Sequence, residues 1–354
     1  MTAVALPAGR TQDTAHQSAA EAAATLRRLA NGLRVSQALF VAAQLGVADR
    51  LAERPLDRFE LATLTGADAA ALGRVMRTLC ALGIFSQSPS GQFSLRPVGQ
   101  FLRSELPGSY RAGVLFQAGA VRWLCWSQLL DTVRTGVSAS ERLLGKPLFE
   151  FYAANPEESK IHDDAMRAAS ASHARTILDA LDLTRDGVVV DIGGGSGELL
   201  TAILAANCGL RGILFDLPDV IDRAVPGLAA IGDRCAVERG SFFERVPRNG
   251  DIYLLKQILH DWDDERAGAI LRCARRCMPD NARLVVIERK LPEVAAPEAD
   301  LETFLTDLEM LVMTSGGRER TEAEFRSLLV NARFEPLRKV PTASPLFLFE
   351  ARAA

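Results

Sequence analysis

Apolar residues follow two different spacings along the chain, and the change between them divides it into two parts. From Ala22 to about residue 180 they recur every three or four positions, which is the spacing of amphipathic helices. From Leu183 onward, short and continuously apolar runs alternate with helical segments, as in a parallel sheet covered on both faces. These runs read GVVVDIG, GILFDLP, DIYLLKQIL, RLVVIERK and PLFLFEARAA. We therefore predict a Rossmann-like, doubly wound α/β domain that follows a mostly helical one.

The helical part contains a second pattern, in which three helical segments precede a small hairpin. The segment DRFELATLTGADAAALGRVMRTLCALGIFSQ leads through a turn, Pro89 to Gln92, into the strand-like FSLRP. This order is typical of a winged helix. The expected recognition helix, Asp68 to Leu82, has only Arg74 and Arg77 as cations, whereas a DNA reader must neutralise phosphates. Because helices such as VSQALFVAAQLGV are apolar, we expect this domain to bind a second copy of the chain.

The length and charge of the chain limit its organisation and its partners. With 354 residues, it exceeds the size at which one core keeps growing. We predict a winged-helix-like dimerisation domain over residues 1–110, and a helical linker with the α/β domain over residues 111–354. Residues 1 to about 20 lack apolar periodicity, so we expect loose order there. The net charge, 41 − 44 = −3, gives no pull toward nucleic acid or an anionic membrane.

Three further absences shape the expectations. No apolar stretch reaches the roughly 18 residues that span a bilayer, and the first residues lack a signal-peptide core, so we expect a soluble, cytoplasmic protein. The six cysteines are too scattered for a disulfide framework. Cys273 and Cys277, with no second pair or nearby histidine, make a poor zinc site. The glycine-rich stretch at residues 193–197 is not accompanied by a carboxylate cluster of the kind that binds magnesium, and we predict no metal.

The stretch VVVDIGGGSGE, from Val188 to Glu198, is the most informative in the chain. An apolar strand ends at Asp191 and breaks into glycines, at the place where α/β sheets bind ligands. The spacing is not G-x-G-x-x-G, because Glu198 stands where a dinucleotide fingerprint has its third glycine, and no P-loop lysine follows. An acidic first turn also disfavours pyrophosphate. The turn therefore favours a cationic or zwitterionic ligand.

A second acidic residue follows the next strand. Asp216, in GILFDLP, ends that strand at the position where a carboxylate can accept hydrogen bonds from ribose hydroxyls. Its distance from Asp191 and the glycines fits this role better than that of a solvated loop carboxylate. We expect a nucleoside-containing ligand.

Several segments together resemble one enzyme family in order and spacing, over nearly the whole chain. They are DIGGGSG, FDLPDVI, GSFF, LLKQILHDWDDE, VVIERKLP and GGRERTEAEF. The family is that of the S-adenosylmethionine-dependent O-methyltransferases, which includes plant caffeate and flavonoid enzymes, the acetylserotonin enzyme and bacterial enzymes of secondary metabolism. The resemblance implies a class I methyltransferase domain, an N-terminal dimerisation domain, S-adenosylmethionine as cofactor and S-adenosylhomocysteine as product.

The resemblance also assigns cofactor-binding residues. It implies that Asp191 and the glycines bind the methionine end of the cofactor, that Asp216 binds ribose, and that Trp262 packs on adenine. Ser241 departs from the family, because many relatives have aspartate there for the adenine amino group. That contact is expected to be weaker or to pass through Phe242. The residues assigned to the cofactor in this way are Asp191, Gly193, Gly195, Asp216, Ser241, Phe242, Lys256, Trp262, Met166 and Ser170.

His260 is the residue that we expect to take a proton from the methyl acceptor. A phenol with a pKa near 10 is about 0.1% ionised at pH 7, so methyl transfer to it needs a positioned base. His260 follows the strand DIYLL and so lies at the ligand edge of the sheet, beside Asp261 and Trp262. A histidine base works best when an acceptor holds its other nitrogen. The family implies that Glu288, at the end of the strand RLVVIE, and Glu319, in the turn SGGRERT, flank it.

The acceptor is less well determined than the cofactor. A hydroxylated aromatic secondary metabolite is favoured, in a pocket near Asp261 with Phe304, Met310 and Met313 as an apolar wall, although helix-spaced Met and Phe are as often core. The family also contains enzymes that methylate an aromatic nitrogen, such as a phenazine N-methyltransferase, or an isoprenoid alcohol, and some that perform other chemistry with the bound cofactor. Retention of His260 with both glutamates favours a hydroxyl. A DNA-binding regulator and a nicotinamide dehydrogenase are the disfavoured alternatives.

Overall fold

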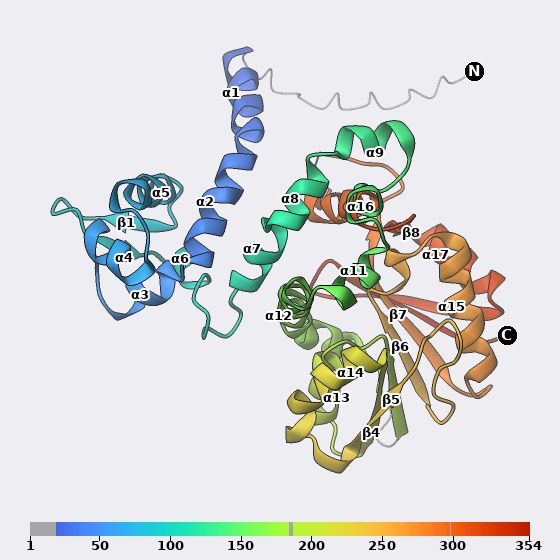
Figure 1. Cartoon of the computed structure of the whole chain (residues 1–354). Coiled ribbons are helices and arrows are strands. Elements are labelled where there is room, and N and C mark those ends of the chain that lie inside the picture. The colour runs from blue at the N-terminus through green and yellow to red at the C-terminus, as the bar shows by residue number, and fades with distance from the viewer. Residues whose placement is uncertain (1–18, 184–186, 298) are drawn as a thin grey trace, which may run out of the picture.

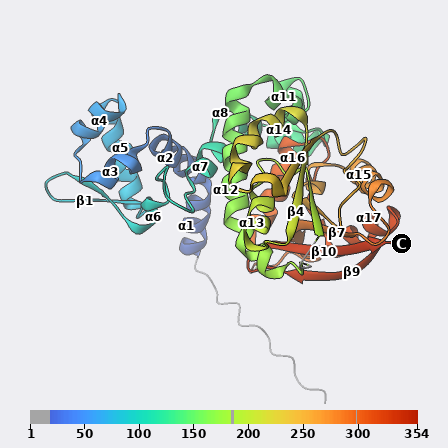
Figure 2. The ribbon, with the colours of Figure 1, turned by 90° about the horizontal axis from the view of Figure 1, so that it is seen from below.

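The computed structural model describes residues 19–183, 187–297 and 299–354, without the side chains of residues 229 and 230. The expectation about residues 1 to about 20 concerns a segment that lies almost wholly outside this range. An N-terminal helical lobe and a larger α/β lobe are joined by further helices (Figures 1 and 2). None of the described helices combines the length and apolar character that crossing a bilayer requires.

The N-terminal lobe has the winged-helix order that the sequence predicts. Its apolar helix faces and the hairpin close over a core that includes Leu61, Met76, Phe85 and Phe93. A capping box at Asp57 and Glu60 begins the fourth helix, and Asp68 caps the fifth. The elements are α1 (Ala19–Ala30), α2 (Gly32–Gln44), α3 (Val47–Glu53), α4 (Arg58–Thr65), α5 (Ala69–Ala81), β1 (Phe85–Gln87), β2 (Phe93–Leu95) and α6 (Pro97–Gln100).

Six helices connect the two lobes and cover one end of the sheet (Figure 1). The first of them packs on both α2 and the last connecting helix, so it joins the N-terminal lobe to the connecting helices. Cys125, Leu148 and Tyr152 from these helices form a small core with Val312 and Met313 from the α/β lobe. The connecting helices are α7 (Arg111–Gln117), α8 (Ala120–Trp126), α9 (Leu129–Thr135), α10 (Ala139–Leu144), α11 (Leu148–Ala154) and α12 (Pro156–Ala180).

The α/β lobe is a twisted sheet with helices on both faces. Its main path of strands has the order β5-β4-β3-β6-β7-β10-β9. The strands are β3 (Gly187–Ile192), β4 (Leu210–Asp216), β5 (Cys235–Arg239), β6 (Ile252–Lys256), β7 (Arg283–Leu291), β8 (Arg320–Thr321), β9 (Phe334–Pro341) and β10 (Leu346–Ala353). The helices are α13 (Glu198–Ala206), α14 (Pro218–Ala224), α15 (Asp264–Cys277), α16 (Leu301–Met313) and α17 (Glu322–Asn331).

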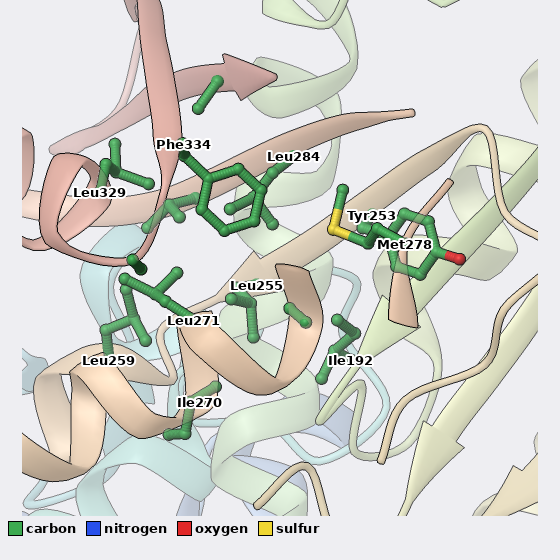
Figure 3. Close-up of a cluster of buried hydrophobic side chains, with 14 of the residues drawn as sticks. Ile192, Tyr253, Leu255, Leu259, Ile270, Leu271, Met278, Leu284, Leu329 and Phe334 are labelled. Atoms are coloured by element: carbon green, nitrogen blue, oxygen red, sulfur yellow. The ribbon is translucent and has the colours of Figure 1, made fainter. Parts of the chain in front are cut away.

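Alternate residues of each buried strand serve two separate cores, because successive side chains of a strand point to opposite faces. On β6, Tyr253 and Leu255 pack with Ile270 and Leu271 of α15 (Figure 3). Their neighbours on β6, Ile252 and Leu254, face the other core, which α12 and α13 cover. Burial on both faces explains why these strands read as continuous apolar runs.

The structure corrects two predictions about the sheet. It is mixed rather than parallel, because β10 lies antiparallel between β7 and β9. A strand that is buried on both faces gives the same continuous apolar run whether it is parallel or antiparallel to its neighbours. Glu288 does not end its strand either: β7 continues to Leu291 because Arg289 still pairs with β10, and Lys290 and Leu291 pair with β8.

The chain reverses its direction of strand addition at β3, and this fixes where a ligand can bind. β4 and β5 are added on one side of β3, and β6 and β7 on the other. The loops that follow β3 and β6 therefore diverge and leave a crevice at the carboxyl edge of the sheet. The glycine turn after β3 and the turn containing His260 after β6 both lie there.

A buried arginine holds the turn after β6 in place. Arg320, at the start of β8, is fully buried. Its Nη1 donates to the Leu259 carbonyl at 2.7 Å and its Nη2 to the Trp262 carbonyl at 2.7 Å. Its Nε donates to Asp264 at 2.9 Å. One planar guanidinium thus ties both ends of the turn to the first turn of α15.

We expect Arg320→Met to lower the free energy of unfolding by about 3 kcal/mol, because two carbonyls of the turn lose their donor. Arg352→Met is the matched control. Arg352 pairs with Glu335 at the surface, so its loss should cost less than about 0.5 kcal/mol. Urea unfolding of both full-length variants, followed by tryptophan fluorescence, measures the difference. Equal losses would contradict the role given to Arg320.

Candidate active site

The glycine turn after β3 leaves no room for a side chain at Gly193, Gly194 or Gly197. Gly193, Gly195 and Gly197 all have positive φ, between 57° and 77°. A Cβ on Gly194 would lie 2.4 Å from Leu214 Cδ1 and 2.7 Å from the Asp191 carboxyl carbon. The backbone therefore passes directly over Asp191 at the crevice, where it can approach a ligand closely.

Asp216 braces this turn from the neighbouring strand. It ends β4, and its two carboxylate oxygens accept hydrogen bonds from Gly195 N at 2.9 Å and Leu217 N at 2.7 Å. Burial raises the pKa of the Asp216 carboxyl, and these backbone amides oppose that shift. Each carboxylate oxygen can accept a further hydrogen bond. Asp216 can therefore hold the glycine turn and still bind hydroxyls.

Lys256 connects the sheet to α12 at the floor of the crevice. Its Nζ donates to Ser170 Oγ at 3.1 Å and to Gln257 Oε1 at 2.9 Å. Burial lowers the pKa of Lys256 to about 8, against the attraction of Asp191 and then Glu288. Burial raises the pKa of Asp191 to about 7, which Lys256 opposes. Met166 lies one turn before Ser170 on α12, so the structure gathers these predicted residues at one place.

Two aromatic rings lie in contact beside the glycine turn. The Phe242 ring lies 3.4 Å from the Cβ position of Gly193. Trp262 meets Phe242 edge-on, with ring centroids 6.2 Å apart, and stacks on Phe149 at 6.0 Å. Ser241 Oγ accepts from the Phe243 amide at 3.3 Å, so its hydroxyl is turned toward the backbone.

His260 lies in a buried group with both predicted glutamates. The imidazole is 6% exposed, and its Nδ1 is 2.8 Å from Glu319 Oε1 and 3.8 Å from Glu288 Oε2. Both carboxylates therefore face the same ring nitrogen. The other nitrogen, Nε2, is 3.7 Å from Asp261 Oδ1, beyond hydrogen-bond distance. A proton on Nδ1, donated to Glu319, leaves Nε2 as an acceptor.

Glu288 has a second task that the sequence does not reveal. Its Oε1 accepts from the Ile258 and Leu259 amides at 3.0 and 2.8 Å, while Oε2 has no hydrogen-bond partner among the described residues. Burial raises the pKa of Glu288 to about 7, and His260 opposes that shift. The carboxyl thus supports the His260 turn and keeps one oxygen toward the imidazole.

Glu319 is buried rather than exposed, although its turn contains two glycines. Its backbone amide donates to Asp307 at 2.9 Å, and the amide of Arg318 donates to the His260 carbonyl at 2.8 Å. A Cβ on Gly317 would lie 2.5 Å from that carbonyl oxygen. Close backbone contact between the two turns therefore brings Glu319 to His260.

The charges around His260 change its basicity strongly. Burial alone would lower the pKa of the imidazole, but the carboxylates of Glu288 and then Glu319 raise it to about 10. Burial raises the pKa of Asp261, which the charges of His260 and His162 oppose. The site therefore has a base about as strong as a phenolate.

The residues predicted for the acceptor pocket are less closely gathered. Asp261 lies beside His260, and Phe304 and Met310 lie on α16, half-buried and buried respectively. Met313 is fully buried in the core that α16 shares with Cys125 and Leu148. Of the two readings that the sequence left open, the structure therefore gives Met313 a place in the core.

Sequence reasoning missed a polar group between the connecting helices and α16. Arg122, Tyr152, His162 and Glu309 lie in segments that read as ordinary amphipathic helix. One signal was available for Arg122, which stands alone as a cation within AVRWLCW. A buried position for a lone arginine in such a run requires a partner, but the sequence does not identify it.

Comparisons with known proteins agree with this geometry. Residues 126–335 match the O-methyltransferase domain, and residues 27–105 match the O-methyltransferase dimerisation domain, which indicates a homodimer. A phenazine O-methyltransferase of Lysobacter antibioticus is 40% identical over 92% of this chain and 95% of its own length. N-methyltransferases also occur among the relatives.

Solved structures show the same fold throughout. The crystal structure of LaPhzM matches with a TM-score of 0.90 and 39% identity, over 94% of this chain and 99% of that one. Human N-acetylserotonin methyltransferase, in complex with S-adenosylmethionine, matches with a TM-score of 0.87 and 28% identity, over 98% and 99% of the two chains. The chain therefore belongs to the family of S-adenosylmethionine-dependent O-methyltransferases that have an N-terminal dimerisation domain.

Proposed function

We propose that this enzyme methylates a hydroxyl group on a flat, fused-ring aromatic metabolite, with His260 as the general base. The observation that supports the proposal best is the contact of 2.8 Å between His260 Nδ1 and Glu319 Oε1 inside the protein. It fixes the imidazole so that Nε2 faces away from both glutamates. The phenazine named in the relative's description supports a fused-ring acceptor.

The residues at the crevice fit S-adenosylmethionine. The bare backbone of the glycine turn suits the methionine end, Asp216 suits ribose hydroxyls, and the aromatic surface of Phe242 and Trp262 suits adenine. Lys256 and Ser170 would hold the polar end of the methionine moiety. When bound, the cofactor supplies an electrophilic methyl group. We also propose that the lobe that binds it begins near residue 111, after the dimerisation domain.

The position of the proton on His260 decides when the imidazole can act as a base. With both glutamates ionised, an imidazole of pKa about 10 stays protonated at pH 7. Both glutamates face Nδ1, so the neutral imidazole keeps its proton on Nδ1 and accepts at Nε2, and this neutral form grows as the pH approaches 10. The strong base matches a phenol of pKa about 10, whereas an ordinary histidine would face an uphill transfer of about 5 kcal/mol.

Asp261 and α16 would position the acceptor. The Asp261 carboxylate lies 3.7 Å from Nε2, so that one hydroxyl placed beside the two atoms could contact both. Phe304 and Met310 on α16 would provide an apolar wall for the ring. A nitrogen acceptor needs no base, and this gives the test that separates O-methylation from N-methylation.

We expect His260→Ala to lower methyl transfer from labelled S-adenosylmethionine to hydroxyphenazines and related phenols by about 10²- to 10⁴-fold. Calorimetric titration with the cofactor should give the same Kd for the variant and the parent, because His260 is not among the residues proposed to hold the cofactor. Label on a ring nitrogen that is unaffected by the substitution would instead establish N-methylation. Normal transfer to oxygen in the variant would contradict the role of His260 as the general base.

We expect kcat/KM to rise with pH toward about 10, because the neutral form of His260 grows as pH approaches its pKa. Glu319→Gln removes one of the charges that raise this pKa, so the rising limb should move to lower pH. Glu335→Gln, at an exposed ion pair, is the control and should leave the limb in place. The pH profile of kcat/KM for His260→Ala reports the ionisation of the acceptor alone. A limb that moves to higher pH in Glu319→Gln would contradict the proposal.

We expect a chelator to leave the activity of the enzyme unchanged. One ligand atom each from His260, Glu288 and Glu319 lies within 4.8 Å of the others, a spacing that a metal ion could also use. The acid–base proposal assigns these atoms to proton transfer instead. Activity after dialysis against EDTA, with and without added Zn²⁺ or Mg²⁺, separates the two roles. Loss of activity that a metal restores would overturn the prediction of a metal-free site.

A further inference from the structure

Arg122 is a buried cation in an aromatic surrounding, and its pairing is incomplete. The residue is 7% exposed. Its guanidinium carbon lies 3.3 Å from the centre of the Phe116 ring, and Nη1 donates to the Tyr152 hydroxyl at 3.0 Å. Burial of a charged arginine costs desolvation free energy, so we expect the buried Arg122 to have a specific role.

Glu309, from α16, is the charge partner of Arg122. Its Oε1 lies 3.0 Å from Arg122 Nε, and its Oε2 accepts from Trp126 Nε1 at 2.6 Å. Yet Arg122 Nε and Glu309 Oε1 are both buried polar atoms without a hydrogen bond of normal geometry among the described residues. One donor and one acceptor are thus held side by side with unused hydrogen-bonding capacity.

The pair lies close to the base. Tyr152 packs against His162, with ring centroids 4.7 Å apart, and His162 meets Phe149, which stacks on Trp262. Trp262 is two residues from His260. The pKa of Asp261, raised mainly by burial, also responds to the charges of His260, His162 and Arg122. An aromatic wall therefore leads from the pair to the oxygen of Asp261 beside His260.

We propose that the Arg122–Glu309 pair is a specificity site that binds a neutral polar substituent of the acceptor ring and rejects a carboxylate. This inference rests on the proposed function and names the acceptor class more closely. A lone arginine in an apolar pocket would attract a carboxylate strongly. Glu309 neutralises that attraction and repels a second carboxylate, while a carbonyl or hydroxyl can still use the adjacent donor and acceptor.

The electrostatics of the rest of the pocket act in the same direction. Asp261 and Glu319 place further carboxylates near the base, and the His260 imidazole is the cation that faces them. An anionic ring would therefore meet Glu309 at one end and these carboxylates at the other. A neutral ring has no such cost and keeps its contacts with the aromatic wall.

The experiment compares a hydroxyphenazine carboxylic acid with its methyl ester, which has nearly the same shape without the charge. The parent enzyme should use the ester with a kcat/KM at least tenfold higher than that of the acid. Glu309→Gln should lower this ratio at least tenfold, chiefly by improving the acid. Arg122→Met should lower kcat/KM for the ester about tenfold. Glu302→Gln, the same change at an exposed position of α16, should leave the ratio unchanged.

Binding is measured beside turnover, so that the failure of this inference and that of the proposed function can be told apart. Quenching of tryptophan fluorescence gives the Kd of acid and ester for the complex with S-adenosylhomocysteine. A shift of the Kd ratio in Glu309→Gln supports the specificity site even if neither compound is methylated. An unchanged ratio in folded Glu309→Gln and Arg122→Lys, a parent that prefers the acid, or no binding of either compound would overturn it.

Discussion

The active site depends on how one short turn, residues 258–262, is held after β6. Its amides at Ile258 and Leu259 donate to Glu288, and its carbonyls at Leu259 and Trp262 accept from Arg320. Buried backbone groups must be paired, and here two side chains of opposite charge share that pairing with backbone groups. Because Glu288 also carries charge close to His260, an interaction that fixes the imidazole in space also sets the field around it.

This double use of Glu288 explains the energetic character of the site. A carboxyl that serves only as a structural acceptor is best stabilised when it stays ionised, but burial raises the pKa of Glu288 to about 7. The same carboxyl can therefore gain or lose a proton near neutral pH without releasing the two amides, which bind Oε1 while Oε2 faces His260. Gln257, at the entrance to the turn, has a positive φ of 52°, and the surrounding bonds hold it in that less favourable conformation.

Local patterns in the sequence predicted most of the fold. They also predicted the site residues that lie at the carboxyl ends of the strands. The apolar runs predicted the buried strands, and the glycines after Asp191 and the carboxylate at Asp216 marked the crevice. The antiparallel β9 and β10 pair was not predicted, because burial on both faces gives the same apolar run in either direction. The burial of Glu319 was not predicted without the family, because its partner His260 is 59 residues away.

The acceptor pocket differs physically from the cofactor crevice, and this difference bears on how specificity arises. The base is fixed to the sheet through Glu288 and Arg320, whereas the proposed specificity pair joins α8 to α16, 187 residues apart in the chain. Glu309 has no local signature, and the lone cation in AVRWLCW does not identify its partner, because an arginine in a helical run is ordinarily exposed. A change at one helix face can therefore alter which ring is accepted without disturbing the turn that holds His260. Arg122 and Glu309 can vary in this way only together, since either charge alone would be left buried without its partner.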